Sequence, residues 1–362
     1  MKLTFVFPCL NEEETLASCV VAVRKSIESV TDDYEVVVAD NGSTDRSREI
    51  AEEEGCRVVP VPVRGYGAAL RGGIEAAEGE YVMFADADMT YQYEDAGPLY
   101  EAAIKNDVDM SIASRMKGTI EAGAMPFLHR YAGTPVLTTL INWLFKGKLS
   151  DCNSGFRCIR KTAYAEWGIR ASGMEFASEL LIKALKARAT TVEIKSGLRK
   201  GPEGRVAHLR TWRDGMRHLL FIFSEKPGLF TWLGGFVLLL ASGLQMASAF
   251  TGPLAVGGLN VFDVHSQALL LLAAIVGGQF YLFGCSLFSQ RGETAKGLTR
   301  TLVELDEGVL FFLLVALLGG ISTVVGVLLV VWAKSSFGGL DLANRLMVWV
   351  HFLAIPLMLT VG

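Results

Sequence analysis

Two acidic residues stand directly after an apolar stretch of the chain. Residues 80–85 have the valine and aromatic content of a buried strand, and Asp86 and Asp88 follow them. Because alternate strand residues point the same way, both carboxylates can face one cation while Ala87 turns aside. Two carboxylates suit Mg²⁺ or Mn²⁺ bound to a diphosphate. The spacing predicts a metal and diphosphate site, and a solvated turn is the alternative for an isolated Asp-X-Asp.

Four more polar or glycine-rich segments follow predicted strands. We expect strands at residues 3–7, 35–39, 57–63, 80–85 and 109–113, separated by helices near 16–30, 43–54, 65–77 and 97–105. Ser43 and Thr44 are the expected N-caps of the second helix. This alternation predicts an α/β domain with a mostly parallel sheet and ligands at the carboxyl ends of its strands. The segments that should meet at this rim are residues 8–12, 40–43, 64–67, 86–88 and 114–115.

Gly65 and Gly67 suggest a dinucleotide fingerprint, but the pattern does not fit one. That motif needs a third glycine three residues later and follows the first strand, whereas residue 70 is Leu and the turn follows the third strand. We therefore interpret Gly65 and Gly67 as a turn that lets the backbone approach a nucleotide. A helix start that needs small residues is the alternative.

The charges divide the chain into two parts. Of its 34 Lys and Arg residues, only five follow Lys226. Four stretches without charged residues, at 229–250, 264–290, 308–333 and 346–362, approach the roughly 20 apolar residues that span a bilayer, and they predict spans at about 229–250, 265–289, 308–333 and 345–362. We predict a cytosolic domain at 1–225 and a four-helix transmembrane region at 229–362. Buried helices of a soluble bundle rarely stay uncharged for so long.

The basic residues predict the orientation in the membrane. Residues 195–226 contain eight Lys or Arg, the link after the second span carries three, and the link at 251–263 has none. By the positive-inside rule, the first domain faces the cytoplasm of an integral protein of the plasma membrane, or of the endoplasmic reticulum in a eukaryote. The N-terminal apolar run is too short for a signal peptide. Six cysteines without a C-x-x-C pair predict free thiols.

Several motifs together resemble a known family. They are Pro8-x-x-Asn11-Glu12, residues 40–45 (DNGSTD), residues 84–88 (FADAD), Ser114-Arg115, and residues 151–157 (DCNSGFR). The set resembles the inverting family-2 glycosyltransferases of GT-A (Rossmann-like) fold, and especially the membrane-tethered polyprenyl-phosphate (dolichyl-phosphate) mannose and glucose synthases. The resemblance covers residues 1 to about 225. It implies a nucleotide-sugar donor, a divalent metal and a lipid-phosphate acceptor, and no nucleic-acid partner; a homo-oligomer is left open.

The resemblance also implies roles for single residues. Those expected to line the nucleotide sugar are Pro8, Leu10, Glu12, Asp40, Gly65, Gly67, Asp86, Ala87 and Asp88, with Asp40 on the base or ribose. Asp86, Asp88 and Thr90 would form the metal site. The chain departs from the family at Asn41, where a second Asp is frequent, at Arg64, where Asn is frequent, and at Thr90, which is Gln in the mannose synthases.

A lipid monophosphate acceptor is already charged, so it needs positioning cations rather than a general base. The candidates are Arg115, Arg130, Arg199, Lys200 and Arg205. Residues 199–205 resemble the family's mobile acceptor loop, in which Arg199 and Arg205 would bind phosphate. Arg115 joins Asp86 and Asp88 as a predicted catalytic residue. A solvated or headgroup-facing charge is the alternative for each cation.

Two further features concern the donor sugar and the bilayer. Glu175 and Glu179 lie four apart, hence on one helix face, and we favour contacts with donor-sugar hydroxyls over a general-base role. Segments at about 135–146 and 206–224 have the apolar stripe and basic flanks of interfacial helices. Packing against a protein core is the alternative for both segments.

The sequence thus predicts an enzyme, a hexosyltransferase that transfers one sugar with inversion to a polyprenyl phosphate at the cytoplasmic membrane face. UDP-glucose is the favoured donor and GDP-mannose the second. A processive polysaccharide synthase is one alternative, although no Gln-x-x-Arg-Trp string occurs. A non-catalytic membrane sensor or lipid carrier of the same fold is another.

Overall fold

The protein is described by a computed structural model of the full chain. The described residues are 1–201, 211–251, 254–256, 259–261, 264–291, 294–304 and scattered positions between 312 and 352. They form two units, Met1–Glu225 and Lys226–Gly362, which are treated separately below.

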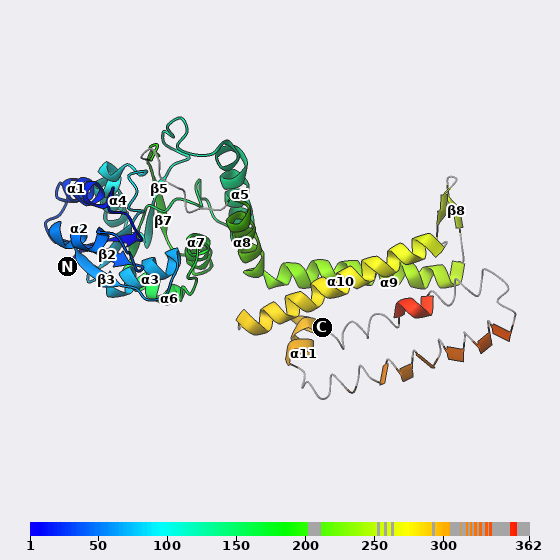
Figure 1. The fold of residues 1–362 in the computed structure, drawn as a ribbon. Coiled ribbons are helices and arrows are strands. Elements are labelled where there is room, and N and C mark those ends of the chain that lie inside the picture. Colours follow the sequence, from blue (N-terminus) through cyan, green and yellow to red (C-terminus); the bar gives the residue numbers. More distant parts are fainter. Residues whose placement is uncertain are drawn as a thin grey trace. The chain divides into compact units, whose positions relative to one another are not determined.

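The first unit is built on a seven-stranded sheet (Figure 1). In spatial order its strands are β3 (Arg57–Pro60), β2 (Tyr34–Asp40), β1 (Leu3–Cys9), β4 (Tyr81–Phe84), β6 (Arg157–Arg160), β5 (Met110–Ser114) and β7 (Thr191–Lys195). All neighbouring strands pair in parallel except β6, which is antiparallel to both β4 and β5. The prediction of an α/β domain is confirmed, but the sheet is mixed because β6 enters its middle.

Helices cover both faces of this sheet (Figure 1). Their bounds are α1 (Leu16–Ile27), α2 (Ser47–Glu53), the 3₁₀ turn η1 (Tyr93–Asp95) and α4 (Ala96–Lys105) on one face, and α3 (Tyr66–Ala76), α5 (Thr134–Phe145), α6 (Lys161–Trp167) and α7 (Phe176–Lys186) on the other. Strand β1 shows how the two cores arise. Phe5 and Phe7 point into the first core and Val6 into the second, as the two-residue strand period requires.

The carboxyl ends of the parallel strands meet at one rim, as predicted. Cys9 at the end of β1 pairs with Asp40 at the end of β2, and Val6 pairs with Phe84, two residues before Asp86. This register brings the segments 8–12, 40–43 and 86–88 to the same edge of the sheet. The fold therefore assembles the predicted site from three separate parts of the chain.

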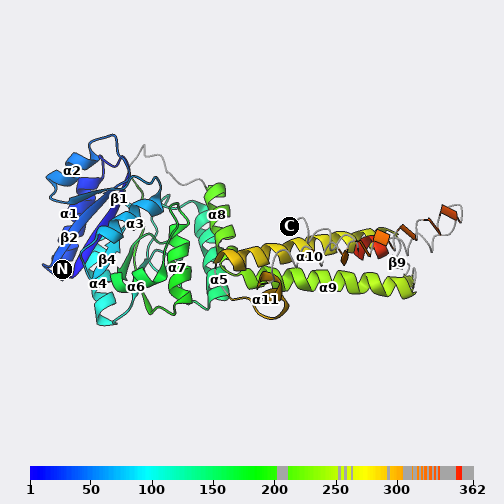
Figure 2. The same ribbon diagram turned by 90° about the horizontal axis from the view of Figure 1, so that it is seen from below.

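Two helices of the first unit carry the predicted interfacial segments. Helix α5 corresponds to 135–146, and α8 (Thr211–Ser224) lies beside it in both views (Figures 1 and 2). Ile141 and Phe145 of α5 are buried, whereas Val136 and Trp143 are exposed. The helix exists, and its contact with a membrane stays a prediction. Residues 206–210 of the second segment lie outside the described residues.

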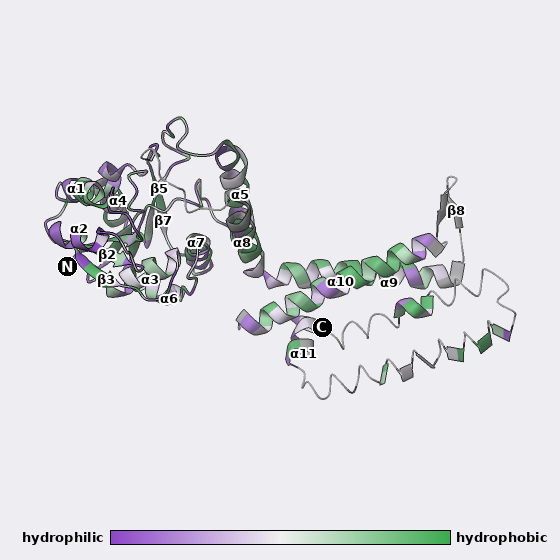
Figure 3. Ribbon diagram, in the orientation of Figure 1, coloured by the Kyte–Doolittle hydropathy of each residue, from purple (hydrophilic) through white to green (hydrophobic). Residues whose placement is uncertain are grey.

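The second unit contains two long apolar helices, α9 (Pro227–Thr251) and α10 (Val264–Arg291). Gly234 approaches Gly277 and Tyr281 while Gly284 approaches Thr231, so the helices pack antiparallel through glycines. Both are long and apolar enough to cross a membrane (Figure 3). The short strands β8 (Leu254–Val256) and β9 (Leu259–Val261) join them, and α11 (Gly297–Glu304) follows. The first two predicted spans correspond to α9 and α10; most of 308–333 and 345–362 lies outside the described residues.

Gly65 and Gly67 stand where another part of the protein comes close. A Cβ atom at Gly65 would lie 2.1 Å from the Ser172 carbonyl oxygen, and one at Gly67 would lie 2.7 Å from that of Ala171. Gly65 also has φ +133°, which side-chain-bearing residues rarely adopt. The segment at 171–173, which precedes α7, thus gives both glycines a structural reason in addition to the predicted nucleotide.

We expect Gly67→Ala to destabilise the protein by about 1–3 kcal/mol, because its methyl group collides with backbone rather than with a flexible side chain. The matched control is Gly133→Ala, where the nearest atom to the new Cβ lies 3.6 Å away. The apparent melting temperature of the full chain in detergent measures both. Equal melting temperatures for the two variants would contradict this account of the close approach.

Candidate active site

Two buried hydroxyl groups hold the backbone of the acidic pair. Thr15, at the start of α1, donates to the Ala87 carbonyl oxygen at 2.6 Å, and Tyr93 of η1 donates to the Asp86 carbonyl oxygen. Both side chains are buried, and Tyr93 belongs to the first core. The segment after β4 is therefore fixed from below, which sets the directions in which its two carboxylates point.

Asp88 and Thr90 form a small local turn. The Asp88 carboxylate accepts hydrogen bonds from the Thr90 amide at 3.0 Å and from the Thr90 hydroxyl. Met89 between them has φ +59°. The Thr90 hydroxyl donates a hydrogen bond to Asp88, and its oxygen keeps lone pairs that could bind a cation. The structure brings Asp88 and Thr90 together, and the role of Thr90 as a metal ligand stays a prediction.

The donor set at this edge fits a hard divalent cation that is shared with a substrate. Among the described residues, no group of three or more His, Cys, Asp or Glu side chains could hold a metal ion. Mg²⁺ is commonly bound by one or two carboxylates together with substrate phosphates. Asp86 and Asp88 match that pattern, with the diphosphate of a donor supplying further oxygens.

The turns after β1 and β2 are joined by hydrogen bonds. The Asn11 side-chain oxygen accepts a hydrogen bond from the Thr44 amide at 2.8 Å. The Asn11 backbone amide donates to the Ser43 hydroxyl at 3.0 Å. The expected N-caps were therefore wrong: α2 begins only at Ser47, and its first amide bonds to Asp45 at 3.0 Å. Ser43 and Thr44 instead fasten the predicted nucleotide-binding segments 8–12 and 40–45 to each other.

Asp40 is buried and fully engaged within the protein. It accepts from the amides of Gly42 at 3.1 Å and Ser43 at 2.9 Å, and it pairs with Arg48 at 2.5 Å. Burial alone would raise the pKa of Asp40, but these hydrogen bonds lower it below its ordinary value. The carboxylate thus stays charged and shapes the turn, and a contact with the base or ribose is still a prediction.

Asn41 explains one departure from the family pattern. Its side-chain amide donates to the carbonyl oxygens of Val61 at 3.1 Å and Val63 at 2.7 Å, and its oxygen accepts from the Gly65 amide at 2.7 Å. An aspartate could not donate to the two carbonyls. Asn41 therefore ties the end of β2 to the start of α3, and Arg64 donates to the Asn41 carbonyl oxygen at 2.6 Å.

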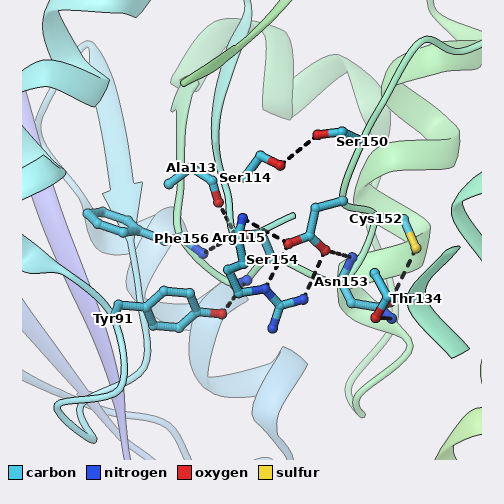
Figure 4. A network of polar contacts seen from close by, with 12 residues as sticks. Tyr91, Ala113, Ser114, Arg115, Thr134, Ser150, Cys152, Asn153, Ser154 and Phe156 are labelled. Carbon is cyan, nitrogen blue, oxygen red and sulfur yellow. Dashed lines mark hydrogen bonds and ion pairs between the residues drawn. The ribbon is translucent and has the colours of Figure 1, made fainter. Parts of the chain in front are cut away.

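Arg115 forms a buried, bidentate ion pair with Asp151 (Figure 4). Its Nε and Nη2 atoms lie 2.7 and 2.9 Å from the two carboxylate oxygens, and its backbone amide donates to Asp151 at 3.1 Å. Burial opposes both charges, yet the attraction raises the pKa of Arg115 and lowers that of Asp151. Asp151 offsets the charge of Arg115, so an acceptor phosphate would have to share this guanidinium.

The start of the predicted acceptor loop runs beside the acidic pair. The Arg199 amide donates to the Thr90 carbonyl oxygen at 2.7 Å, and the Arg199 guanidinium pairs with Glu94 at 3.1 Å. The Lys200 amide donates to Glu121 at 2.9 Å. The Arg199 backbone thus lies close to Thr90, and the binding of an acceptor phosphate by its side chain stays a prediction.

The contacts described for Arg130 do not link it to this edge. Arg130 lies in the π-helical turn η2 (His129–Gly133), with its guanidinium 5.4 Å from the centre of the Tyr131 ring. Among the described residues, no contact joins Arg130 to Arg115 or Arg199. Arg205 lies outside the described residues.

Glu175 and Glu179 lie one helical turn apart, as expected, since Glu175 is the N-cap of α7 and its carbonyl oxygen accepts from the Glu179 amide at 2.9 Å. Glu179 is buried in α7 and accepts from the amides of Arg170 at 3.0 Å and Ala171 at 2.6 Å, while its other oxygen pairs with Lys183 at 2.7 Å. Glu175 precedes the helix and accepts from the Gly173 amide at 3.2 Å. Both carboxylates hold the segment that covers Gly65 and Gly67, and contacts with sugar hydroxyls stay a prediction.

Three residues of the site carry no role in the sequence analysis. Asp151 appears there only within a motif, and Tyr66 and Tyr91 carry no predicted role. Tyr91 accepts a hydrogen bond from the Gly155 amide at 2.7 Å, and Tyr66 reaches Asp86. Two tyrosines close to predicted functional residues, at 66 between the glycines and at 91 after the acidic pair, were the available signal.

Replacing Asp151 by Asn should cost about 3–5 kcal/mol of stability at neutral pH, because Arg115 would stay buried without its partner. The pKa of Asp151 is lowered in the folded state, so the pair stabilises above the ordinary carboxyl pKa of about 3.9 and this stabilisation is lost as the pH falls further. The difference in the free energy of unfolding between wild type and Asp151→Asn should therefore become smaller in acid.

Unfolding of the full chain measured between pH 7 and pH 3 tests this expectation. The control is Asp107→Asn, since Asp107 pairs with Arg160 but its side chain is 87% exposed. Exposed pairs contribute roughly 0–1 kcal/mol. An Asp151→Asn variant as stable as Asp107→Asn would contradict the assigned importance of the buried pair.

Comparison with known proteins gives the family. A family model described as "Glycosyl transferase family 2" matches residues 4–168. Over 349 residues the chain is 33% identical to the low-salt glycan biosynthesis hexosyltransferase Agl6 of Haloferax volcanii, which covers 94% of this chain and 82% of that relative. It is 31% identical over 183 residues to the dolichyl-phosphate hexose transferase of the same organism, covering 50% and 75% of the two chains.

A third relative is the dolichol-phosphate mannosyltransferase of Pyrococcus furiosus, which is 27% identical over 228 residues, or 60% of this chain and 63% of that protein. The residues matched by the family model, 4–168, include the acidic pair and the turns after β1 and β2. The predicted glycosyltransferase is thereby confirmed, and the chain belongs to glycosyl transferase family 2.

Proposed function

We propose that the protein transfers a single hexose from a nucleotide sugar to a polyprenyl phosphate, with inversion at the anomeric carbon of the sugar. Asp86 and Asp88, with Thr90 beside them, would hold Mg²⁺ or Mn²⁺. When bound, the cation neutralises charge on the departing diphosphate. The turns at 8–12 and 40–45, which the structure joins through Asn11, would bind the nucleotide.

The observation that carries this proposal is the hydrogen bond between the Arg199 amide and the Thr90 carbonyl oxygen, at 2.7 Å. It supports a site in which the cations of the 199–205 loop face the acidic pair. A phosphate carries about −1.5 to −2 charges near neutral pH, so the acceptor is already a nucleophile and these cations have only to orient it. Arg115 would add a partly neutralised positive group, and Arg130 and Arg205 are further candidates.

The relatives support the acceptor class. One is named a dolichyl-phosphate hexose transferase and another a dolichol-phosphate mannosyltransferase. For the donor we place UDP-glucose first and GDP-mannose second, because Thr90 departs from the Gln that the mannose synthases have at this position. Glu175 and Glu179 hold the segment at 171–173, which covers the start of α3. We also propose that these two carboxylates contact hydroxyl groups of the donor sugar.

The apolar helices support membrane anchoring. Only 22% of each of the two apolar windows is buried, and large side chains such as Trp232, Leu239 and Leu269 are exposed. The core helix of a soluble protein would bury most of these groups. We propose that α9 and α10 are two of four spans, that the first unit faces the cytoplasm, and that Val136 and Trp143 on α5 enter the headgroup layer.

Product formation tests the reaction directly. Purified full-length protein, incubated with Mg²⁺, a polyprenyl phosphate and radiolabelled UDP-glucose, should yield a labelled, chloroform-soluble glycolipid carrying one sugar. GDP-mannose is the second donor to be assayed. Absence of any product with UDP-, GDP- and dTDP-hexoses would contradict the proposal, and a high-molecular-weight polymer would indicate a processive synthase instead.

Asp88→Asn should lower kcat by at least about 10²–10³-fold, because a weaker cation site stabilises less of the negative charge that develops on the leaving diphosphate. Asparagine can still accept the two hydrogen bonds from Thr90, so the local turn should persist. Asp32→Asn is the matched control, since Asp32 is exposed and precedes the opposite end of β2. Steady-state rates of both variants at saturating donor test this, and a fully active Asp88→Asn would contradict the metal site.

A further inference from the structure

Three oxygen atoms surround Gly155, the glycine that precedes β6. A Cβ atom at this position would lie 2.9 Å from the Tyr91 hydroxyl, 3.2 Å from the Tyr66 hydroxyl and 3.4 Å from Asp86 Oδ2. The Gly155 amide donates to the Tyr91 hydroxyl at 2.7 Å, and Figure 4 shows Tyr91 directed at this part of the chain. Gly155 and the two phenols thus form a close-packed floor beneath the Asp86 carboxylate.

Tyr66 is the member of this floor that bonds to Asp86 itself. Its hydroxyl makes a hydrogen bond with the Asp86 carboxylate. A phenol, with an ordinary pKa of about 10, keeps its proton at neutral pH and is therefore the donor in this bond. Since Tyr66 is the first residue of α3, the Asn41–Gly65 bond and the bond from the Ala68 amide to the Ser172 carbonyl, at 3.1 Å, hold its backbone on both sides.

Arg157 holds the other side of the floor. Its guanidinium is fully buried and donates to the carbonyl oxygens of Cys152 and Ala177, each at 2.9 Å. The first bond closes the chain between residues 152 and 157 around Gly155, and the second joins it to the first turn of α7. These two bonds restrain the segment that carries Gly155.

We propose that Tyr66 is a positioning residue, which holds the Asp86 carboxylate in the orientation that binds the metal. The inference rests on the proposed role of Asp86 as a ligand. A carboxylate rotates readily about its last bond, so a fixed donor on one oxygen directs the other oxygen and its lone pairs. Partners that orient a ligand in this way typically change metal affinity by about 10–100-fold when they are lost.

Tyr66→Phe in the full-length protein tests the proposal by metal binding rather than by turnover. We expect the affinity for Mn²⁺, titrated in the presence of UDP and followed by the electron paramagnetic resonance signal of free Mn²⁺, to fall about tenfold. The affinity for UDP without metal should not change. Tyr164→Phe is the matched control, because it removes a hydroxyl from another buried tyrosine, on α6, and should bind Mn²⁺ like wild type.

A second variant approaches the same floor from another side. Gly155→Ala places a methyl group against the Tyr91 and Tyr66 hydroxyls and should weaken Mn²⁺ binding in the same direction. Mn²⁺ affinity of Tyr66→Phe equal to that of wild type would overturn the inference, as would a parallel loss of metal-free UDP binding, which indicates general disruption. Wild-type protein that binds no Mn²⁺ with UDP would instead overturn the proposed metal site itself.

Discussion

The arrangement of the site depends on the buried ion pair between Arg115 and Asp151. Arg115 follows β5, whereas Asp151 begins the segment that leads into β6. Two charges removed from water are costly unless they satisfy each other, and here three hydrogen bonds join them. The pair therefore fixes where the chain turns back between β4 and β5, and with it the position of Gly155 below the acidic pair. The antiparallel β6 is thus part of how the site is built.

A second constraint is that many charged side chains at the rim are already engaged in hydrogen bonds or ion pairs within the protein. Asp40 and Glu179 each accept hydrogen bonds from two backbone amides, and Arg115 is paired with Asp151. Each of these groups fixes a turn that borders the proposed nucleotide or sugar. The effect of Asp40 and Glu179 on catalysis would then be indirect, through the shape of the rim. The proposed chemistry uses Asp86, Asp88 and Arg199 directly, and Arg115 would add a partly neutralised positive charge.

The sequence predicted the parts of the fold that rest on local pattern. Strands β1, β2, β4 and β5 are apolar runs followed by polar turns, so both their existence and their common rim could be predicted. Strand β6 could not, because Arg157 and Arg160 flank only two apolar residues. The partners of Asp40, Asn41 and Glu179 were also beyond prediction, since a side chain's type does not tell whether a backbone amide from a distant segment will occupy it.

The two acids of the predicted metal site differ in what holds them. Asp88 is held by Thr90, two residues away, so its turn is encoded locally in the Asp-X-Thr spacing. Asp86 depends on Tyr66, Tyr93 and the floor at Gly155, which come from three other parts of the chain. The Asp-X-Thr spacing can therefore supply the geometry of the second acid by itself. The first acid acquires a defined direction only when the whole sheet has formed, and a metal site needs both.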